Sequence, residues 1–250
     1  MKILLTNDDG IYARGLAALY EELSRDAECL IVAPEIEQSA VGHAITLSRP
    51  LMVRSATKGG RFLGYAVCGT PADCVKIGIK ELAGPLPDFV VSGVNRGANC
   101  GNNVIYSGTV SAATEAAMMG VTSMAVSLDS HKEADYSIAA RMARKLVFAI
   151  AANASLAGGA FNVNVPCLPE DQIRGIVVVR QGRGRTIESF EKRVDPRDNI
   201  YYWMSGEKTP GPQDMDTDLG ALAAGYVTVT PIQYDLTRYD LMETVKKIIP

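Results

Sequence analysis

The chain has 250 residues, of which 47% are hydrophobic and 21% are charged, and its formal net charge is -3. This length allows one large domain or a core with an appended lobe, and the charge balance gives no basis for a nucleic-acid or membrane partner. The longest apolar runs are far shorter than a membrane span, and the first residues do not resemble a signal peptide, so we expect a cytoplasmic location.

The few cysteines and histidines argue against several kinds of metal site and several classes of phosphatase. Five scattered cysteines contain no Cys-x-x-Cys pair, so neither a disulfide framework nor a zinc site is predicted. His43 and His131 are the only histidines, too few for a histidine-nucleophile phosphatase or a binuclear metallophosphoesterase. No Gly-x4-Gly-Lys-Ser/Thr loop occurs, and no Gly-x-Gly-x-x-Gly turn follows a strand, so neither a P-loop NTPase nor a standard dinucleotide fold is indicated.

The chain begins with an alternation of strands and helices. A strand is predicted at 2–7, a helix with one apolar face at 15–23, and a fully apolar strand at 28–34. Two strands joined by a helix form a parallel pair with a right-handed crossover, so we expect an α/β fold with a mostly parallel sheet. The pattern then predicts a hairpin of 46–56 and 61–68, a helix at 70–82, a strand at 88–93, a helix at 110–120, a strand at 121–128, a helix at 133–157 and a strand at 161–166.

The character of the sequence changes after Pro169. A strand is predicted at 174–180, and the polar residues 181–212, rich in Arg, Gly and Pro, predict an extended arm or hairpin. The one apolar cluster of this arm, residues 200–204, contains Trp203 and two tyrosines, which would be costly to expose, so we expect a partner surface there. The remaining predicted elements are a helix at 214–224, a strand at 225–232 and a terminal helix at 240–249.

Two adjacent carboxylates follow the first strand. Asp8 and Asp9 stand before Gly10 at the carboxyl end of an apolar strand, which is the edge of an open α/β sheet where ligands bind. Neighbouring anions repel each other, and a divalent cation is their natural partner. The alternative is that one aspartate caps the following helix while Gly10 makes the turn.

Two further oxygen-bearing side chains leave neighbouring strand ends. Ser39 follows the strand at 28–34, and Asn95 follows the strand at 88–93. Because the carboxyl ends of parallel strands meet at one edge of the sheet, we expect both side chains to join the two aspartates. Such hard oxygen ligands suit Mg²⁺ or Mn²⁺ and suit zinc poorly.

Ser107, Gly108 and Thr109 begin a predicted helix behind a loop rich in glycine and asparagine. Free N–H groups and the positive end of the helix dipole favour an anion at such a position, and the two hydroxyls add donors. The alternative is that Ser107 or Thr109 is a plain N-cap. Beside a metal site, the three residues would complete a phosphate site.

Four other side chains near these loops have two interpretations each. His43 either donates a proton to a leaving oxygen or pins the Ser39 loop through hydrogen bonds. Arg14 and Arg96 either contact phosphate or remain solvated. Tyr106 either stacks on a base or packs beneath its loop.

These motifs resemble those of the SurE family. They are Thr-Asn-Asp-Asp-Gly-Ile at 6–11, Ala-Pro-x3-Gln-Ser-x2-Gly-His at 33–43, Ser-Gly-Val-Asn-Arg-Gly-x-Asn at 92–99 and Tyr-Ser-Gly-Thr-Val-Ser-Ala-Ala at 106–113. Thr217-Asp218 and the run at 225–231 also resemble the C-terminal pattern of the family. The resemblance therefore covers nearly the whole chain in the right order.

The resemblance implies a metal-dependent phosphatase of nucleoside 5′-monophosphates that often extends to 3′-nucleotides and short polyphosphate. It implies one divalent cation per subunit, Mg²⁺ or Mn²⁺, on Asp8, Asp9, Ser39 and Asn95. The catalytic candidates are Asp8, Asp9 and His43, and the substrate-binding candidates are Asn95, Arg96, Tyr106, Ser107, Gly108 and Thr109. It also implies a Rossmann-like core with helices on both faces of the sheet, residues 1–180. A smaller C-terminal lobe, residues 181–250, would exchange its segments between the subunits of a homodimer or homotetramer.

The expected reaction is direct attack of metal-activated water on a phosphomonoester, with residues 107–109 and Asn95 orienting the phosphoryl group. One alternative is a phosphatase that forms an aspartyl-phosphate. Such enzymes separate their two aspartates by one residue, whereas Asp8 and Asp9 are adjacent. A second alternative is a nucleotide-binding regulatory protein without turnover, with the aromatic arm as its output surface.

Overall fold

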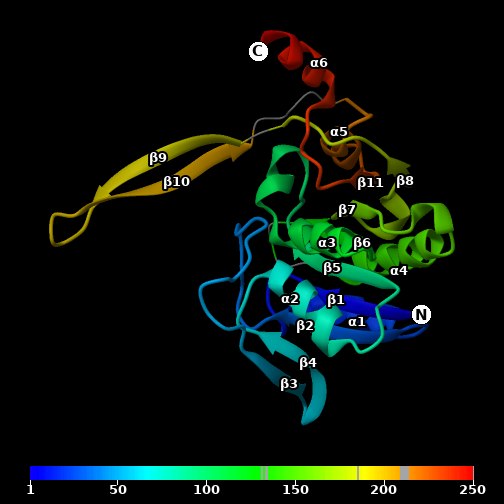
Figure 1. The fold of residues 1–250 in the computed structure, drawn as a ribbon. Coiled ribbons are helices and arrows are strands. Elements are labelled where there is room, and N and C mark those ends of the chain that lie inside the picture. Colours follow the sequence, from blue (N-terminus) through cyan, green and yellow to red (C-terminus); the bar gives the residue numbers. More distant parts are fainter. Residues whose placement is uncertain (131, 133–134, 185, 209–213, 250) are drawn as a thin grey trace.

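The computed structural model describes residues 1–130, 132, 135–184, 186–208 and 214–249. Its centre is a nine-stranded sheet in the order β3-β4-β2-β1-β5-β6-β7-β11-β8 (Figure 1). A second, two-stranded sheet consists of β10 and β9 and projects away from the body of the molecule. The β9–β10 hairpin therefore takes no part in the large sheet.

The strands and helices have the following bounds. The strands are β1 (Lys2–Thr6), β2 (Glu28–Pro34), β3 (Val53–Lys58), β4 (Arg61–Val67), β5 (Phe89–Arg96), β6 (Thr122–Asp129), β7 (Ala160–Pro166), β8 (Ile176–Val178), β9 (Thr186–Val194), β10 (Ile200–Lys208) and β11 (Val227–Ile232). The α-helices are α1 (Arg14–Leu23), α2 (Pro71–Ile77), α3 (Gly108–Met118), α4 (Ser137–Ala151), α5 (Asp218–Ala223) and α6 (Tyr239–Ile248). A π-helical turn, η1 (Gly78–Leu82), continues α2, and the 3₁₀ turns are η2 (Gly101–Tyr106), η3 (Ala154–Leu156) and η4 (Glu170–Gln172).

The centre of the sheet is parallel. β1 lies between β2 and β5, and Leu4 is opposite Leu30 on one side and Val90 on the other. The β5–β6 and β6–β7 pairs are also parallel, whereas the β3–β4 hairpin and the β11–β7 pair are antiparallel. The prediction of a mostly parallel sheet is confirmed, and its central strands read as continuous apolar runs because both faces are covered.

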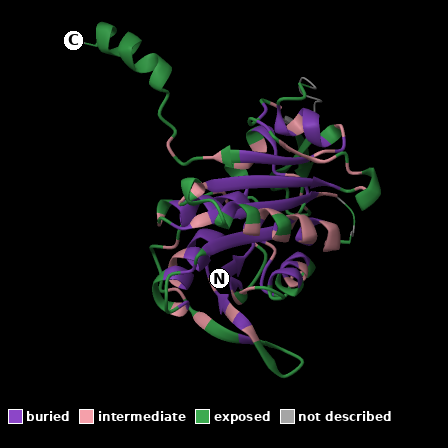
Figure 2. Ribbon diagram, turned by 90° about the vertical axis from the view of Figure 1, so that its right-hand side faces the viewer, coloured by how far each residue is buried: buried purple, intermediate pink, exposed green. Residues whose placement is uncertain are grey.

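Helices cover both faces of this sheet. α1 packs beside α4 on one face, and α2 packs beside α3 on the other. The apolar stripe of α1, which includes Leu16, Leu19 and Leu23, enters the larger core cluster. α3 instead places small side chains such as Ala112 and Ala116 in the second cluster, so this helix can lie close to the strands. Figure 2 shows the central strands buried between these layers.

The C-terminal segments are arranged in three ways. β11 returns to the main sheet between β7 and β8. The predicted arm at 181–212 contains the β9–β10 hairpin, and residues 185 and 209–212 of that range lie outside the described part of the chain. α6 lies at the end of an extended segment and is exposed along its length (Figure 2). The hairpin and α6 thus lie outside the sheet-and-helix body.

Several element boundaries differ from the sequence-based expectations. The first strand of the hairpin begins at Val53 rather than at 46, because Asp73 holds the intervening segment by accepting hydrogen bonds from the backbone and hydroxyl of Thr46 at 3.0 and 2.6 Å. The helix predicted at 133–157 begins at Ser137, and residues 133–134 lie outside the described residues. The strand predicted at 88–93 extends to Arg96, and the elements predicted at 174–180 and 214–224 are shorter than expected.

No described helix combines the length and apolar character needed to cross a bilayer.

Replacing Gly15 with alanine is expected to lower the free energy of unfolding by about 3 kcal/mol, the upper part of the usual range for overpacking. α1 packs on β5, and a Cβ atom at Gly15 would overlap the carbonyl oxygen of Val94. Denaturant unfolding followed by circular dichroism measures the loss. Ala17→Gly on the same helix is the control, since it loses only helix propensity, about 1 kcal/mol. Equal losses in the two variants would contradict this packing.

Candidate metal and phosphate site

The predicted site residues leave three neighbouring strands at their carboxyl ends. Asp8 and Asp9 follow β1, and the loop of residues 35–45 follows β2. Asn95 is the second-last residue of β5. In the sheet these strands stand in the order β2-β1-β5. The convergence expected from the sequence therefore has the required topology.

The turn after β1 gives neither aspartate a capping role on the next helix, α1. Asn7 shapes this turn: its amide nitrogen donates to the carbonyl of Gly10 at 2.9 Å, and its amide oxygen accepts from the Gly10 N–H at 3.2 Å. The next helix, α1, has Ala13 as N-cap, makes no side-chain cap hydrogen bond and has no acidic residue in its first turn. The interpretation that an aspartate caps this helix is wrong.

Asp8 is buried against the start of α3. The hydroxyl of Thr109 donates to Asp8 Oδ1 at 2.5 Å. A Cβ atom at Gly108 would lie 2.9 Å from the Cβ atom of Asp8, so only glycine allows the helix to start this close to the carboxylate. α3 therefore presents its positive end to the first aspartate.

The local charge is strongly negative. Burial raises the pKa of Asp8. Burial also raises the pKa of Asp9 to about 6, the charges of Asp8 and Glu37 act in the same direction, and the charge of Arg96 lowers it. Three carboxylates beside one guanidinium need additional positive charge to remain ionised together. The chemistry of this donor set therefore fits a divalent cation.

The loop after β2 brings Ser39 and a further carboxylate to the edge. The Gln38 N–H donates to the carbonyl oxygen of Asp8 at 2.7 Å, which ties the loop to the end of β1. The hydroxyl of Ser39 donates to Glu37 Oε1 at 2.5 Å, so its oxygen keeps its lone pairs for a cation. Sequence reasoning missed Glu37, although its position two residues before Ser39 on the same loop was a signal.

Asn95 is oriented by its own strand end. Its amide nitrogen donates to the carbonyl of Gly97 at 2.7 Å, so the amide oxygen is the group left for a cation. The pairing of β5 with β6 shifts register between Ser92 and Asn95, and the peptide bond between Gly93 and Val94 is cis. The end of this strand is therefore irregular, and Asn95 is partly buried there beside an exposed Arg96.

Ser107 is the N-cap of α3, as one of its two interpretations required. Its hydroxyl oxygen accepts from the N–H of Val110 at 3.1 Å. This cap uses only the acceptor side of the hydroxyl, and its hydrogen is still able to donate to an anion. Capping and anion binding are therefore compatible in this side chain.

Both ring nitrogens of His43 have partners on α3. Its Nε2 atom lies 2.8 Å from Glu115 Oε2, and its Nδ1 atom lies 3.4 Å from the hydroxyl of Thr114, both on α3. A proton donor to a leaving oxygen needs a ring nitrogen directed at the substrate. The geometry of His43 favours the pinning role over proton transfer.

The remaining candidates differ in position. The ring of Tyr106 is exposed, and its carbonyl oxygen accepts from the N–H of Gly42 at 3.1 Å, which joins two loops of the site. Arg14 lines a surface cavity with Lys58 and Asp135 on the side of α1 and α4. In the described residues, no cluster of three His, Cys, Asp or Glu side chains could hold a metal ion. The candidate site instead combines two carboxylates with a hydroxyl and an amide.

Buried polar contacts fix the loop at 99–103 beside this edge, and sequence reasoning missed them. The N–H of Asn99 donates to Asn164 Oδ1 at 2.8 Å, and its carbonyl accepts from Asn162 Nδ2 at 2.7 Å. The buried carboxylate of Asp218 accepts from the N–H groups of Gly101 and Gly182 at 2.9 and 2.8 Å. The C-terminal part of the chain therefore holds a loop that borders the site.

Comparison with known proteins gives a consistent result. A family model described as "Survival protein SurE" matches residues 3–188. The 5′-nucleotidase SurE of Syntrophus aciditrophicus is 60% identical over 250 residues, covering 100% of this chain and 94% of that protein. The 5′-nucleotidase SurE of Syntrophobacter fumaroxidans is 52% identical over 99% of both chains.

A solved structure supports the same relationship at the level of the fold. The crystal structure of the SurE protein from Aquifex aeolicus matches with a TM-score of 0.87 and 36% sequence identity, over 99% of each chain. The relatives and this structure match along nearly the whole chain, and the family model matches residues 3–188. The chain belongs to the SurE family.

Proposed function

We propose that this chain is a phosphatase that depends on a divalent metal ion and hydrolyses nucleoside 5′-monophosphates to nucleoside and phosphate. Relatives that carry the name 5′-nucleotidase SurE and match along the whole chain support the substrate class. The observation that carries the metal dependence is the adjacent pair Asp8 and Asp9, whose pKa values are raised and which do not cap α1. As the family resemblance implies, the proposal includes 3′-nucleotides and short polyphosphate as substrates. It also includes a cytoplasmic location.

The proposed metal site holds one Mg²⁺ or Mn²⁺ ion per subunit. Its ligands are the side-chain oxygens of Asp8, Asp9, Ser39 and Asn95. When bound, such a cation neutralises phosphate charge and lowers the pKa of a coordinated water. Two hydrogen bonds hold the proposed ligands Ser39 and Asn95 in place in the metal-free protein. The Gln38 N–H donates to the carbonyl oxygen of Asp8 next to Ser39, and the amide nitrogen of Asn95 donates to the carbonyl oxygen of Gly97.

The proposed phosphate contacts come from the start of α3 and the end of β5. Ser107 donates its hydroxyl hydrogen to a phosphate oxygen while its lone pair caps the helix. Thr109 fixes the carboxylate of Asp8, and Gly108 allows the start of α3 to lie against that carboxylate. Arg96 adds a positive charge near Asp9. Stabilising the charge spread over the phosphoryl oxygens is the main task of such a site.

The proposed nucleoside contact is Tyr106. The residue is 60% exposed immediately before the proposed phosphate-binding turn, and its carbonyl oxygen accepts a hydrogen bond from Gly42 in the loop that carries Ser39. An exposed aromatic face at this position can stack on a nucleobase. This stacking tolerates different bases, which agrees with the broad substrate range implied by the family resemblance.

Asp8→Asn and Asp9→Asn are each expected to lower metal-dependent phosphate release from AMP or GMP by more than ~100-fold, because loss of a ligand exceeds the usual effect of losing a supporting contact. The far-ultraviolet circular dichroism spectrum is expected to remain unchanged. Asp26→Asn is the matched control, since Asp26 is an exposed carboxylate that pairs with Arg144. The measurement is phosphate release at saturating Mn²⁺.

Three outcomes would contradict the proposal. Near-normal turnover in both variants would remove the two carboxylates from the metal site. Tight nucleotide binding by the unmodified protein without any phosphate release would indicate a regulatory protein instead. A trapped acyl-phosphate on Asp8 or Asp9 would replace attack by water with a covalent mechanism.

The metal-free protein is expected to gain thermal stability from Asp9→Asn in a pH-dependent way. The pKa of Asp9 is about 6 in the folded protein and 3.8 in the reference state, so ionisation opposes folding. The penalty is absent well below pH 3.8, grows as the pH rises toward 6 and is constant above it. Melting temperatures in EDTA should therefore differ little at pH 4 and most above pH 6. A difference that shrinks with rising pH would contradict the burial of this charge.

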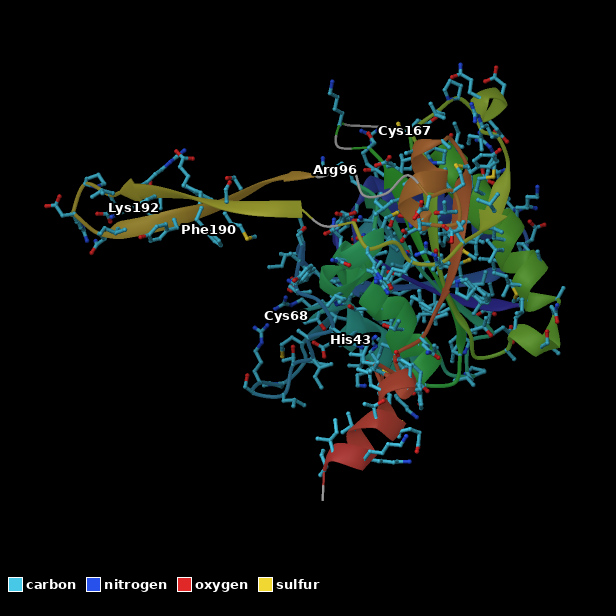
Figure 3. All side chains as sticks on the ribbon, turned by 90° about the horizontal axis from the view of Figure 1, so that it is seen from above. His43, Cys68, Arg96, Cys167, Phe190 and Lys192 are labelled. Atoms are coloured by element: carbon cyan, nitrogen blue, oxygen red, sulfur yellow. The ribbon has the colours of Figure 1, made fainter. Side chains whose placement is uncertain are left out.

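We also propose that the β9–β10 hairpin and α6 exchange between subunits of a homodimer or homotetramer, with residues 1–180 as the core and 181–250 as the oligomerisation lobe. On one face of the hairpin, alternate positions carry the exposed apolar side chains of Phe190, Val194, Tyr202 and Met204. Figure 3 shows Phe190 on the projecting part of this hairpin. Because an isolated two-stranded hairpin is marginally stable in water, this face needs a partner, and the family resemblance indicates a second copy.

Phe190→Glu combined with Met204→Glu is expected to shift the protein from oligomer to monomer. The two residues are paired across the hairpin, so the change places two like charges on the proposed contact face. Analytical ultracentrifugation measures the mass. Ser205→Glu is the control, because Ser205 pairs with Ser189 on the opposite face of the hairpin. An unchanged mass in the double variant would exclude this face from the interface.

A further inference from the structure

The loop of residues 35–45 holds an unfavourable backbone conformation. Ala40 has a φ of 56° and Gly42 a φ of 58°, so a residue with a side chain occupies the left-handed region. Such a conformation persists only where the surrounding structure holds it in place. Ser39 stands directly before Ala40, and its position therefore depends on what fixes the loop.

Backbone contacts hold the two sides of this loop. The N–H of Gln38 bonds to the carbonyl of Asp8 before Ser39, and the N–H of Gly42 bonds to the carbonyl of Tyr106 after it. The hydroxyl of Thr70 donates to the carbonyl of Ala44 at 2.7 Å. His43 adds a side-chain contact of a different kind, because it reaches a buried charge.

That buried charge is Glu115, in the middle of α3. Only 2% of its surface is exposed, and its two carboxylate oxygens have different partners. Oε2 lies 2.8 Å from His43 Nε2, while Oε1 accepts a hydrogen bond from the ammonium group of Lys76 on α2. The hydrogen bond with His43 is the main cause of a lowered pKa of Glu115, and the contact with Lys76 acts in the same direction. The group is thus an ionised carboxylate, and a buried charge of this kind requires partners.

We propose that Glu115 is a positioning residue for the site: through His43 it fixes the loop of residues 35–45 and thereby holds Ser39 beside Asp8 and Asp9. It acts on the reaction only through His43. The inference rests on the proposed function to the extent that Ser39 is taken as a metal ligand. The competing explanation is that Glu115 only joins α3 to α2 through Lys76.

Three variants separate these explanations. Glu115→Gln keeps the size of the side chain and removes its charge. His43→Ala removes the link to the loop and leaves the contact between Glu115 and Lys76. Lys76→Met is the matched control, because it removes the link between α2 and α3 and leaves the contact of Glu115 with His43.

The first measurement is the affinity for Mn²⁺ alone, by titration with electron paramagnetic resonance. Glu115→Gln and His43→Ala should each weaken Mn²⁺ binding by about 10- to 100-fold, the range for groups that orient metal ligands. The double variant should be no weaker than the poorer single variant, because both act through one contact. Lys76→Met should bind close to the wild-type affinity, and kcat of Glu115→Gln should recover at saturating Mn²⁺.

The second measurement is amide hydrogen exchange in the metal-free protein. Residues 38–42 should exchange faster in Glu115→Gln and His43→Ala, and at the wild-type rate in Lys76→Met. This comparison is independent of turnover, so it decides the positioning role even if the wild-type protein binds no Mn²⁺ and the proposed function fails. Wild-type Mn²⁺ affinity and unchanged loop exchange in Glu115→Gln would overturn the inference, and so would equal effects of Lys76→Met and Glu115→Gln.

Discussion

The two carboxylates at the end of β1 are the constraint on which the functional edge depends. A central strand of a parallel sheet is enclosed on both faces, and its end offers little water to ionised groups. Here Asp8 is buried, Asp9 is partly buried, and Glu37 adds a third negative charge. Three groups partly compensate this negative charge: the positive end of α3, the hydroxyl of Thr109 and the guanidinium of Arg96. These groups reduce the charge without removing it, and the remaining negative charge supports the proposal of a divalent cation at this edge.

The same arrangement gives each neighbouring element a defined task. β2 and β5 flank β1, so the loops that leave them reach the carboxylates by the shortest route. α3 contributes its first turn to Asp8 and its middle, through Glu115, to His43. One helix therefore contacts both the strand end and the loop that carries Ser39. The small side chains of α3 let the helix lie close to the sheet, which is compatible with both contacts.

Much of this edge was predictable from the sequence, because it depends on local patterns and on strand order. Apolar runs followed by Asp8, Ser39 and Asn95 identify strands and the loops behind them, and parallel topology then brings these loops together. The capping alternative for the aspartates could not be excluded in this way, because it depends on where α1 begins. The structure places that start at Arg14, after an N-cap that is not acidic.

The contacts that support the site were not predictable, and the reason is physical. Glu115 lies in a helix that reads as small and apolar, and its partners are 39 and 72 residues away along the chain. Asp218 reaches the loop at Gly101 across 117 residues. A single sequence carries no signal for such pairs, because neither residue of a pair shows which distant residue it will contact. The start of β3 was misplaced for the same reason, since Asp73 holds the segment before it through the side chain and N–H of Thr46.

The position of β11 has a consequence for how the protein is made. β7 is buried along its whole length, with β6 on one side and β11 on the other. Residues 167–226 separate β7 from β11 (Val227–Ile232), so a nascent polypeptide carries a β7 with one unpaired edge until β11 has been made. An open strand edge of this kind pairs readily with other chains. Synthesis therefore includes an interval in which residues 1–166 are complete but their sheet still has an open edge that is prone to aggregation, and the interval ends when β11 pairs with β7.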